Sequence, residues 1–121
     1  MPVSTVLALL VGVGTGSHAA EQIHRLTGSQ IRAQLVGKTL TDDTHWRETY
    51  APGGKLLIEE AGYPSSAGSW RIDGDRLCKV RPGVLNDCFE VWAAGEQVEL
   101  RHGRDHPLVG FLRPSRGTGA H

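Results

Sequence analysis

The sequence predicts a mainly β protein, in which an antiparallel up-and-down meander of about eight strands closes into a small barrel. From Lys38 onward, side chains alternate with a period of two, so that Trp46, Glu48 and Tyr50 fall on one face of a strand. Glycine and proline recur between these runs, and short connections make neighbouring strands antiparallel. Closing the meander would remove its open edges. A two-sheet sandwich is the alternative.

One amphipathic helix is predicted near the N-terminus, over residues 28–36. Thr27 can cap its first turn, and Gln30, three residues later, can complete a capping box. Ile31 and Leu35 share one helical face. So short a helix is not stable alone, and we expect that face to dock on the sheet.

The strands themselves are expected wherever an alternating run lies between turn-forming residues. Strands of five or six residues leave an interior that side chains can fill, so a packed interior is expected rather than a roomy cup. The predicted strands are Lys38–Thr41, His45–Ala51, Lys55–Glu60, Gly68–Asp73, Arg76–Val80, Cys88–Ala93, Gln97–His102 and Leu108–Arg113.

The first part of the chain is typical of a signal peptide, residues 1–19. It has an apolar run without Lys, Arg, Asp or Glu, followed by the small residues Ser17 and Ala19 before the predicted cleavage site. A buried strand or a short anchor is the alternative, but the run is too short to cross a bilayer. The mature chain then comprises one domain, 20–113, and a flexible tail, 114–121.

The only two cysteines, Cys78 and Cys88, are predicted to form a disulfide across a hairpin. A redox pair or a metal site is disfavoured, because there is no Cys-x-x-Cys and no histidine beside either residue. Closing so short a loop is worth about 2.5–3 kcal/mol in the chain-entropy model. A structural disulfide fits a periplasmic or secreted protein.

The charge balance disfavours two classes of partner. Thirteen basic and thirteen acidic residues give a formal net charge of zero, so no overall field attracts nucleic acid or an anionic membrane. After signal cleavage no stretch is long enough to span a membrane. The partners that remain are a small molecule or another envelope protein.

The middle of the chain resembles small exported bacterial domains of unknown function that have a lipocalin-like β-barrel. The segments that carry this resemblance are Tyr50-Ala51-Pro52-Gly53-Gly54-Lys55, Gly68-Ser69-Trp70-Arg71-Ile72, Asp75-Arg76-Leu77-Cys78 and Cys88-Phe89-Glu90-Val91. The resemblance covers about 27–113 and implies the barrel shape of a lipocalin, although lipocalins have their Gly-x-Trp on the first strand. It implies no particular activity.

Four residues are candidates for ligand binding: His45, Arg47, Arg71 and Glu90. If His45 and Arg47 point into the barrel, they form a polar floor for an anionic ligand, with Arg71 as a neighbour. The favoured alternative points them outward and places the aromatic residues of the same strand in the core. Glu90 enters a second hypothesis, in which it lines a catalytic pocket with His45 and Arg47.

No catalytic or cofactor signature is present, and no cofactor is predicted. His102 and His106 flank a turn and are weak candidates for a metal site, since a specific site needs three or four ligands. Two solvated turn histidines are the favoured alternative. Among the aromatic residues, Trp70 and Trp92 are predicted to lie in the core, and Tyr63 is predicted to be exposed.

These observations favour a non-enzymatic exported envelope protein that binds a small ligand or another protein. One alternative is an isomerase or cyclase of the small-barrel type. The other is an inhibitor of a secreted hydrolase that acts through an exposed loop, 61–66 or 102–107. A ligand-sized pocket would favour binding or catalysis, whereas a filled core with an exposed aromatic loop would favour protein interaction.

Overall fold

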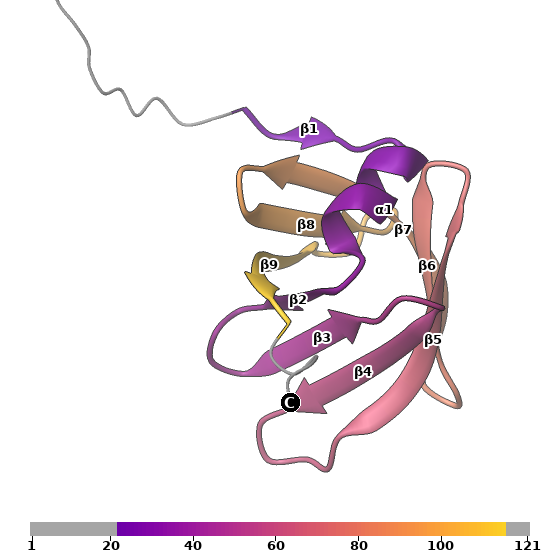
Figure 1. Ribbon diagram of the computed structural model, residues 1–121, viewed down its shortest axis with the longest axis vertical. Helices are drawn as coiled ribbons and strands as arrows, with labels where there is room; N and C mark the ends of the chain where they lie inside the picture. Colours follow the sequence, from indigo (N-terminus) through magenta and orange to yellow (C-terminus); the bar gives the residue numbers. More distant parts are fainter. Residues whose placement is uncertain (1–21, 116–121) are drawn as a thin grey trace, which may run out of the picture.

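From Lys38 to Pro114 the chain runs up and down through eight consecutive antiparallel strands, β2 to β9, which close into a barrel (Figure 1). The computed structural model describes residues 22–115. The barrel closes because β2 pairs with β9, for example at Leu40 and Leu112. The prediction of an antiparallel up-and-down barrel is confirmed, and the two-sheet sandwich is excluded. The strands are β1 (His24–Arg25), β2 (Lys38–Thr41), β3 (Trp46–Tyr50), β4 (Lys55–Glu60), β5 (Ser66–Asp73), β6 (Arg76–Arg81), β7 (Leu85–Ala94), β8 (Gln97–Arg101) and β9 (Leu108–Pro114).

The inward faces of the strands form a continuous apolar core. Residues directly opposite each other point to the same face, so one buried residue on each strand fixes which side chains line the interior. Large side chains fill the middle of the barrel, as expected for so small a structure. The buried apolar residues are Leu26, Ile31, Leu35, Leu40, Tyr50, Leu56, Ile58, Trp70, Leu77, Val91, Ala93, Val98 and Leu100.

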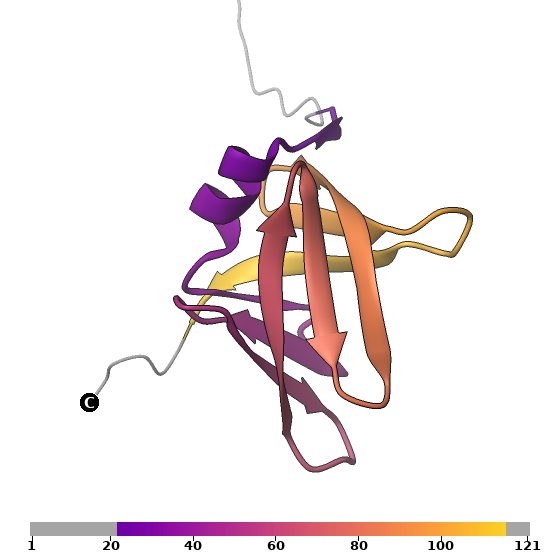
Figure 2. The ribbon, with the colours of Figure 1, turned by 90° about the vertical axis from the view of Figure 1, so that its right-hand side faces the viewer.

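The helix α1 (Gly28–Leu35) covers one end of the barrel beside the β5–β6 turn (Figure 2). The predicted capping box is present, with Thr27 and Gln30 each bonding the other's backbone. The predicted docking face is also confirmed, since Ile31 and Leu35 are fully buried. The helix ends one residue before the predicted boundary, at Leu35.

Close backbone contact holds the start of α1 against the β5–β6 turn. The Gly28 amide donates to Asp75 Oδ1 at 2.7 Å, and Arg25 Nη2 donates to the Asp75 carbonyl at 3.2 Å. A Cβ at Gly28 would lie 2.1 Å from the Gly74 carbonyl oxygen. Only glycine therefore permits this approach.

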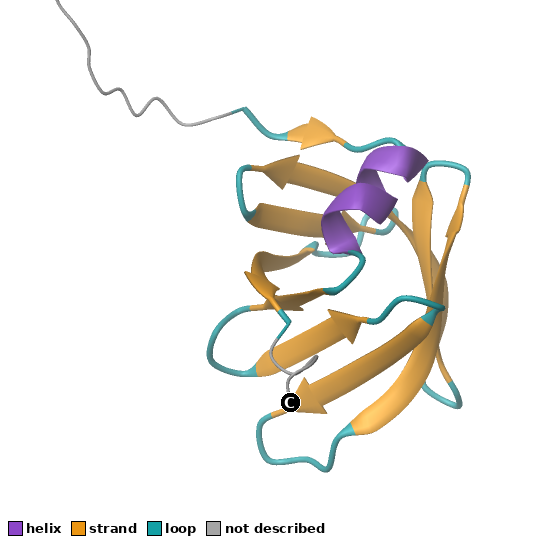
Figure 3. Ribbon diagram, viewed as in Figure 1, coloured by secondary structure: helices purple, strands orange, loops and turns teal. Residues whose placement is uncertain are grey.

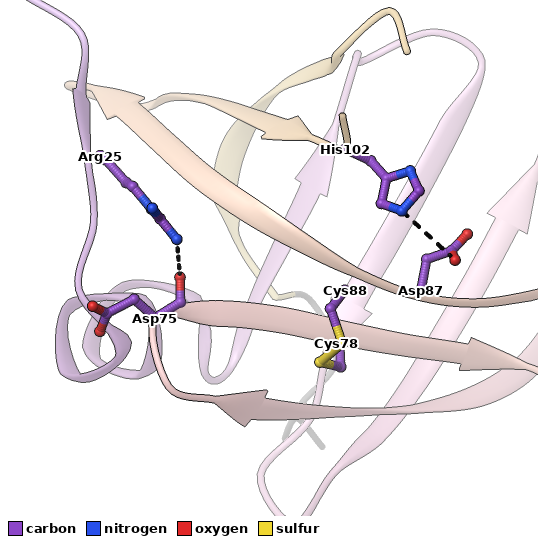
Figure 4. Close-up of a disulfide and its surroundings, with 6 residues drawn as sticks. All are labelled: Arg25, Asp75, Cys78, Asp87, Cys88 and His102. Carbon is purple, nitrogen blue, oxygen red and sulfur yellow. Dashed lines mark hydrogen bonds and ion pairs between the residues drawn. A yellow bond between two sulfur atoms is a disulfide. The ribbon is translucent and has the colours of Figure 1, made fainter. Parts of the chain in front are cut away.

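The predicted disulfide joins β6 and β7, where Cys78 and Cys88 lie directly opposite each other with their Cα atoms 3.9 Å apart (Figure 4). Cys78 is 1% exposed. The disulfide therefore links the two strands of the hairpin at its middle. No free cysteine remains among residues 22–115.

We expect the double variant Cys78→Ala, Cys88→Ala to lose about 2.5–3 kcal/mol of unfolding free energy, because the unfolded chain gains loop entropy. Alanine is chosen because serine would bury a hydroxyl group at Cys78. Urea unfolding followed by tryptophan fluorescence measures the change. Wild-type protein that has been reduced should show the same loss, and a change below about 1 kcal/mol would contradict this estimate.

Several element boundaries differ from those predicted. Figure 3 shows the strands in orange and the helix α1 in purple. β5 begins at Ser66, β7 begins at Leu85, and β9 continues to Pro114, which pairs with Lys38. Proline is tolerated there because it closes the strand and lacks only the N–H donor. The predicted flexible tail thus cannot begin at Pro114.

Two predicted segments fall wholly or mostly outside the described residues. These are the signal peptide, 1–19, and the remainder of the tail, 116–121. The extra strand β1, by contrast, was not predicted, because its two residues are too few to show alternation. Between residues 22 and 115, no helix is long and apolar enough to cross a membrane.

Candidate functional site: a groove on the outer face of the barrel

A groove of about 1180 Å³ runs over the outer face of β2, β3 and β4, three strands that lie side by side in Figure 1. Its floor is made of the outward-pointing threonines Thr39, Thr41 and Thr49. Thr39 lies opposite Thr49 in the sheet. Leu40, which lies between Thr39 and Thr41 on β2, points into the core. The groove is therefore separated from the interior by the sheet itself.

The threonines make a low floor because they are short and their neighbours are long. Although they point outward, Thr39 and Thr41 are only 7% and 5% exposed. The hydroxyls of Thr39 and Thr49 lie 2.9 Å apart, and Thr41 Oγ1 donates to the Trp46 carbonyl at 2.6 Å. These bonds satisfy the hydroxyls and fix the floor of the groove.

An ion-paired arginine forms one wall of the groove. Arg113 Nη2 lies 2.8 Å from Asp43 Oδ2, and Nη1 lies 3.1 Å from Glu96 Oε1. The hydrogen bond with Arg113 lowers the pKa of Asp43, and the same bond raises the pKa of Arg113. This wall is held by charge pairs that are in place before any ligand binds.

The opposite side of the groove presents exposed apolar groups. Leu57 on β4 is 38% exposed, and Tyr63 in the β4–β5 loop is 72% exposed. The exposure of Tyr63 confirms the sequence prediction. An exposed phenol beside a groove is a typical contact group in protein interfaces.

Three unpaired charged side chains line the groove between these walls. Arg47 on β3 lies opposite Glu59 on β4, and Lys55 stands at the start of β4. Within residues 22–115, none of the three makes a hydrogen bond or an ion pair. They are free to pair with groups of a ligand.

The four residues proposed from the sequence as a ligand site do not come together. His45 and Arg47 both line the outer groove, and Arg47 points away from the barrel interior. Arg71 lies on the outer face of β5, opposite Cys78. Glu90 lies on β7, away from the groove.

Glu90 belongs to a separate charge cluster. It accepts a hydrogen bond from Trp92 Nε1 at 3.0 Å and lies 3.6 Å from Arg25. The hydrogen bond from Trp92, with the charge of Arg25, lowers the pKa of Glu90. The pocket that would join Glu90 to His45 and Arg47 is therefore not assembled.

Comparisons with protein-family models, with curated proteins and with solved structures found no match to this chain. The resemblance to small exported bacterial domains therefore stays a prediction. The function has to be inferred from the chain's own residues, and above all from those that line the groove.

The candidate metal residues lack a ligand set. His102 Nδ1 lies 3.1 Å from Asp105 Oδ2, and its Nε2 lies 3.8 Å from Asp87 Oδ1 (Figure 4). The histidine ring also packs against Phe89. In the described part of the chain, no group of three or more His, Cys, Asp or Glu side chains is placed to hold a metal ion.

The sequence did not reveal a polar cluster inside the barrel. Lys79 Nζ lies 2.8 and 3.0 Å from the two carboxylate oxygens of Glu48, and Tyr50 donates to the same carboxylate at 2.7 Å. Burial, then the Glu48 charge, raises the pKa of Tyr50 well above its usual range. Glu48 shares its face with Tyr50, and that alternation was the only available signal.

Trp92 corrects a sequence prediction. It lies opposite Glu99 on the outer face and outside the core, with Arg101 stacked 4.1 Å from its ring centroid. The fully buried inward positions of β7 are Val91 and Ala93, and Phe89 on the same face packs against the core. Neighbouring apolar residues on one strand leave the direction of alternation ambiguous.

Asp42 organises the turn that enters β3 and borders the groove. Its Oδ1 accepts from the backbone amides of Thr44, His45 and Trp46 at 2.9, 2.6 and 3.1 Å. Burial opposes the charged form, but these hydrogen bonds outweigh it and hold the pKa of Asp42 well below its usual range. The charged carboxylate therefore stabilises the turn.

We expect acid to destabilise the protein partly through Asp42. Because its pKa is lower in the folded state, its stabilisation is present above the unfolded pKa of about 3.9 and is lost as the pH falls toward the folded value. Asp42→Asn should be less stable at neutral pH and should lose less stability than wild type below about pH 4. Urea unfolding across this pH range measures both effects. Asp73→Asn serves as the control, because it removes an aspartate outside this turn. If the unfolding free energy falls equally steeply with pH for Asp42→Asn and wild type, the expectation is contradicted.

Proposed function

We propose that this protein is a non-enzymatic exported module of the bacterial envelope, which binds an extended segment of a partner protein in the outer groove. The observation that carries the proposal is the groove itself, which has a rigid threonine floor and three unpaired charges. A partner segment could pair its carboxylates with Arg47 and Lys55, and its cations with Glu59. Its apolar side chains would lie against Leu57 and Tyr63.

The shape of the groove favours a polypeptide over a small molecule. Pockets that enclose small molecules are concave sites of roughly 300–1,000 Å³ that bury most of the ligand. This groove, of about 1180 Å³, lies on the outer face of the barrel and is open to solvent along its length, so it does not enclose a small ligand. The barrel interior, by contrast, is filled with buried side chains.

Export is supported by the disulfide and by the signal-like N-terminus. Disulfides persist in oxidising compartments and are rare in the cytosol. The bridge between Cys78 and Cys88 is therefore in keeping with a periplasmic or secreted location. Residues 1–19 have the apolar run and small residues of a signal peptide.

An inhibitor of a secreted hydrolase is the second candidate function. Tyr63 is the observation that favours it, because the ring projects from loop 61–65 at 72% exposure. Such an inhibitor would insert this loop into its target without pairing with Arg47 in the groove. The enzyme alternative lacks its pocket, as His45 and Arg47 lie apart from Glu90.

Site-specific photo-crosslinking in the native host tests the proposal. A photoreactive amino acid at Leu57, inside the groove, should give a protein adduct that the same residue at Val84 does not. Val84 is the matched control because it is also exposed, at 68%, but does not line the groove. The substitution Arg47→Glu should abolish the adduct at Leu57.

Three outcomes would count against the groove. Adducts that form equally at Val84 would remove it as the binding surface. A third probe placed at Tyr63 that alone gives an adduct, insensitive to Arg47→Glu, would favour the inhibitor. A small molecule retained in native mass spectrometry, with no protein adduct, would overturn the protein partner in favour of a small ligand.

A further inference from the structure

A second, smaller hollow of about 610 Å³ lies between the end of α1, the β3–β4 turn and β5. Two arginines line it: Arg32 from the last turn of α1, and Arg71 from the outer face of β5. Both side chains are exposed. No acidic residue is among the described residues that line the hollow.

These two arginines differ from the basic residues of the barrel that are ion-paired. Arg25, Arg81, Arg101, Arg113 and Lys79 each lie next to a carboxylate. Arg32 and Arg71 have no carboxylate partner within residues 22–115. Two like charges around one hollow repel each other, and an anion placed between them would relieve that repulsion.

The buried indole of Trp70 positions one of the two arginines. Arg32 lies over the ring, with its guanidinium carbon 5.8 Å from the ring centroid. Trp70 itself is 5% exposed, and its Nε1 donates to the Ala51 carbonyl at 2.9 Å. The arginine therefore stacks on a fixed surface and loses less conformational freedom on binding a ligand.

The end of α1 opposes an anion, but only weakly. The carboxyl end of a helix carries about half a negative charge, whereas the two guanidinium groups carry two full positive charges. Guanidinium groups also bind carboxylates in a bidentate manner. The balance favours an anion.

The hollow adjoins the groove at Pro52, which lines both. Lys55, which has no ion pair among the described residues, lies on the groove side of this proline, and Arg71 lies on the other side. A polypeptide lying in the groove could therefore extend past Pro52 into the hollow.

We infer that the hollow between Arg32 and Arg71 is a carboxylate subsite, which takes an acidic side chain of the partner segment that lies in the groove. The inference rests on the proposed function for the identity of the ligand. The anion site itself rests only on the two unpaired arginines, the fixed Trp70 surface and the absence of acidic residues from the described lining.

Nuclear magnetic resonance with two defined peptides tests the inference. The probes are N-acetyl-tetraglutamate amide and N-acetyl-tetraglutamine amide, titrated into the full chain. We expect saturable shifts of the Arg32 and Arg71 side-chain Nε–H signals with the glutamate peptide and none with the glutamine peptide. Raising NaCl from about 20 to 500 mM should weaken binding at least fivefold, because salt screens exposed charges.

Arg71→Gln should weaken glutamate-peptide binding at least tenfold, as expected for a bidentate contact. Arg104→Gln is the matched control, since Arg104 is an exposed arginine, unpaired within residues 22–115, that lines neither hollow nor groove. Equal losses in the two variants, or equal binding of the two peptides, would overturn the subsite.

The position of the shifts separates this inference from the proposed function. Shifts at Arg32 and Arg71 with no adduct in the crosslinking at Leu57 would keep the anion site and reject the peptide groove. Shifts confined to Thr49 and Leu57, equal for both peptides, would keep the groove and reject the anion site.

Discussion

Replacing Lys79 alone with methionine is expected to lower the free energy of unfolding by about 3–5 kcal/mol. The side chains of Lys79 and Glu48 are only 3% and 12% exposed, and they pair inside the barrel. Removing the lysine leaves the Glu48 carboxylate inside an apolar interior, with the Tyr50 hydroxyl as its remaining donor among the described residues. An uncompensated buried charge is among the most costly changes a protein can undergo.

The triple variant Lys79→Met, Glu48→Leu, Tyr50→Phe should recover most of that loss. It removes both charges together, and the tyrosine must change too because its buried hydroxyl would otherwise lose its acceptor. Well-packed apolar replacements of buried ion pairs are often neutral or stabilising. Urea unfolding followed by tryptophan fluorescence compares the variants.

Arg47→Met is the control for this comparison, because Arg47 lies on the outer face of the same sheet and has no partner among the described residues. We expect it to change stability by less than about 0.5 kcal/mol. A loss below about 1 kcal/mol for Lys79→Met would contradict the importance of the buried pair. If the triple variant is no more stable than Lys79→Met, then poor packing of the new side chains, and not the unpaired charge, causes the loss of stability.

Local signals in the sequence predicted the parts of the fold that depend on few neighbours. One short segment contains both signals for the helix, which are the capping box at Thr27 and Gln30 and the apolar face of Ile31 and Leu35. The hairpin disulfide likewise joins residues ten positions apart. These features need no knowledge of how distant strands pair.

Strand pairing over long distances made the rest unpredictable. Lys79 meets Glu48 across 31 positions, and Arg113 meets Asp43 across 70 positions, the second only because β9 closes on β2. Alternation gives the faces of a strand, but it does not state which strands become neighbours. The threonine floor was hidden for the same reason, since Thr39 and Thr49 become a pair only in the sheet.

Trp70 and Trp92 are chemically identical, and the sheet gives them opposite positions. Trp70 is inward-facing and 5% exposed, and packs edge-on against Tyr50 with ring centroids 5.9 Å apart. Trp92 is outward-facing and half-buried, with its N–H bonded to Glu90. Alanine variants at these two positions therefore compare how much a core tryptophan and a surface tryptophan contribute to the free energy of unfolding.

Trp70→Ala is expected to cost about 3–5 kcal/mol, because it opens a cavity beside Tyr50 and removes one of the two donors to the Ala51 carbonyl, which keeps only the Gly54 amide. Trp92→Ala should cost only about 1 kcal/mol, since solvent can replace its contacts with Glu90 and Arg101. Urea unfolding monitored by far-ultraviolet circular dichroism avoids dependence on either fluorophore. Equal losses for the two variants would mean that the outer face of β7 is packed as tightly as the core. The stability loss for Trp70→Phe should lie between those for Trp70→Ala and Trp92→Ala, because phenylalanine fills most of the cavity but cannot donate a hydrogen bond to the Ala51 carbonyl.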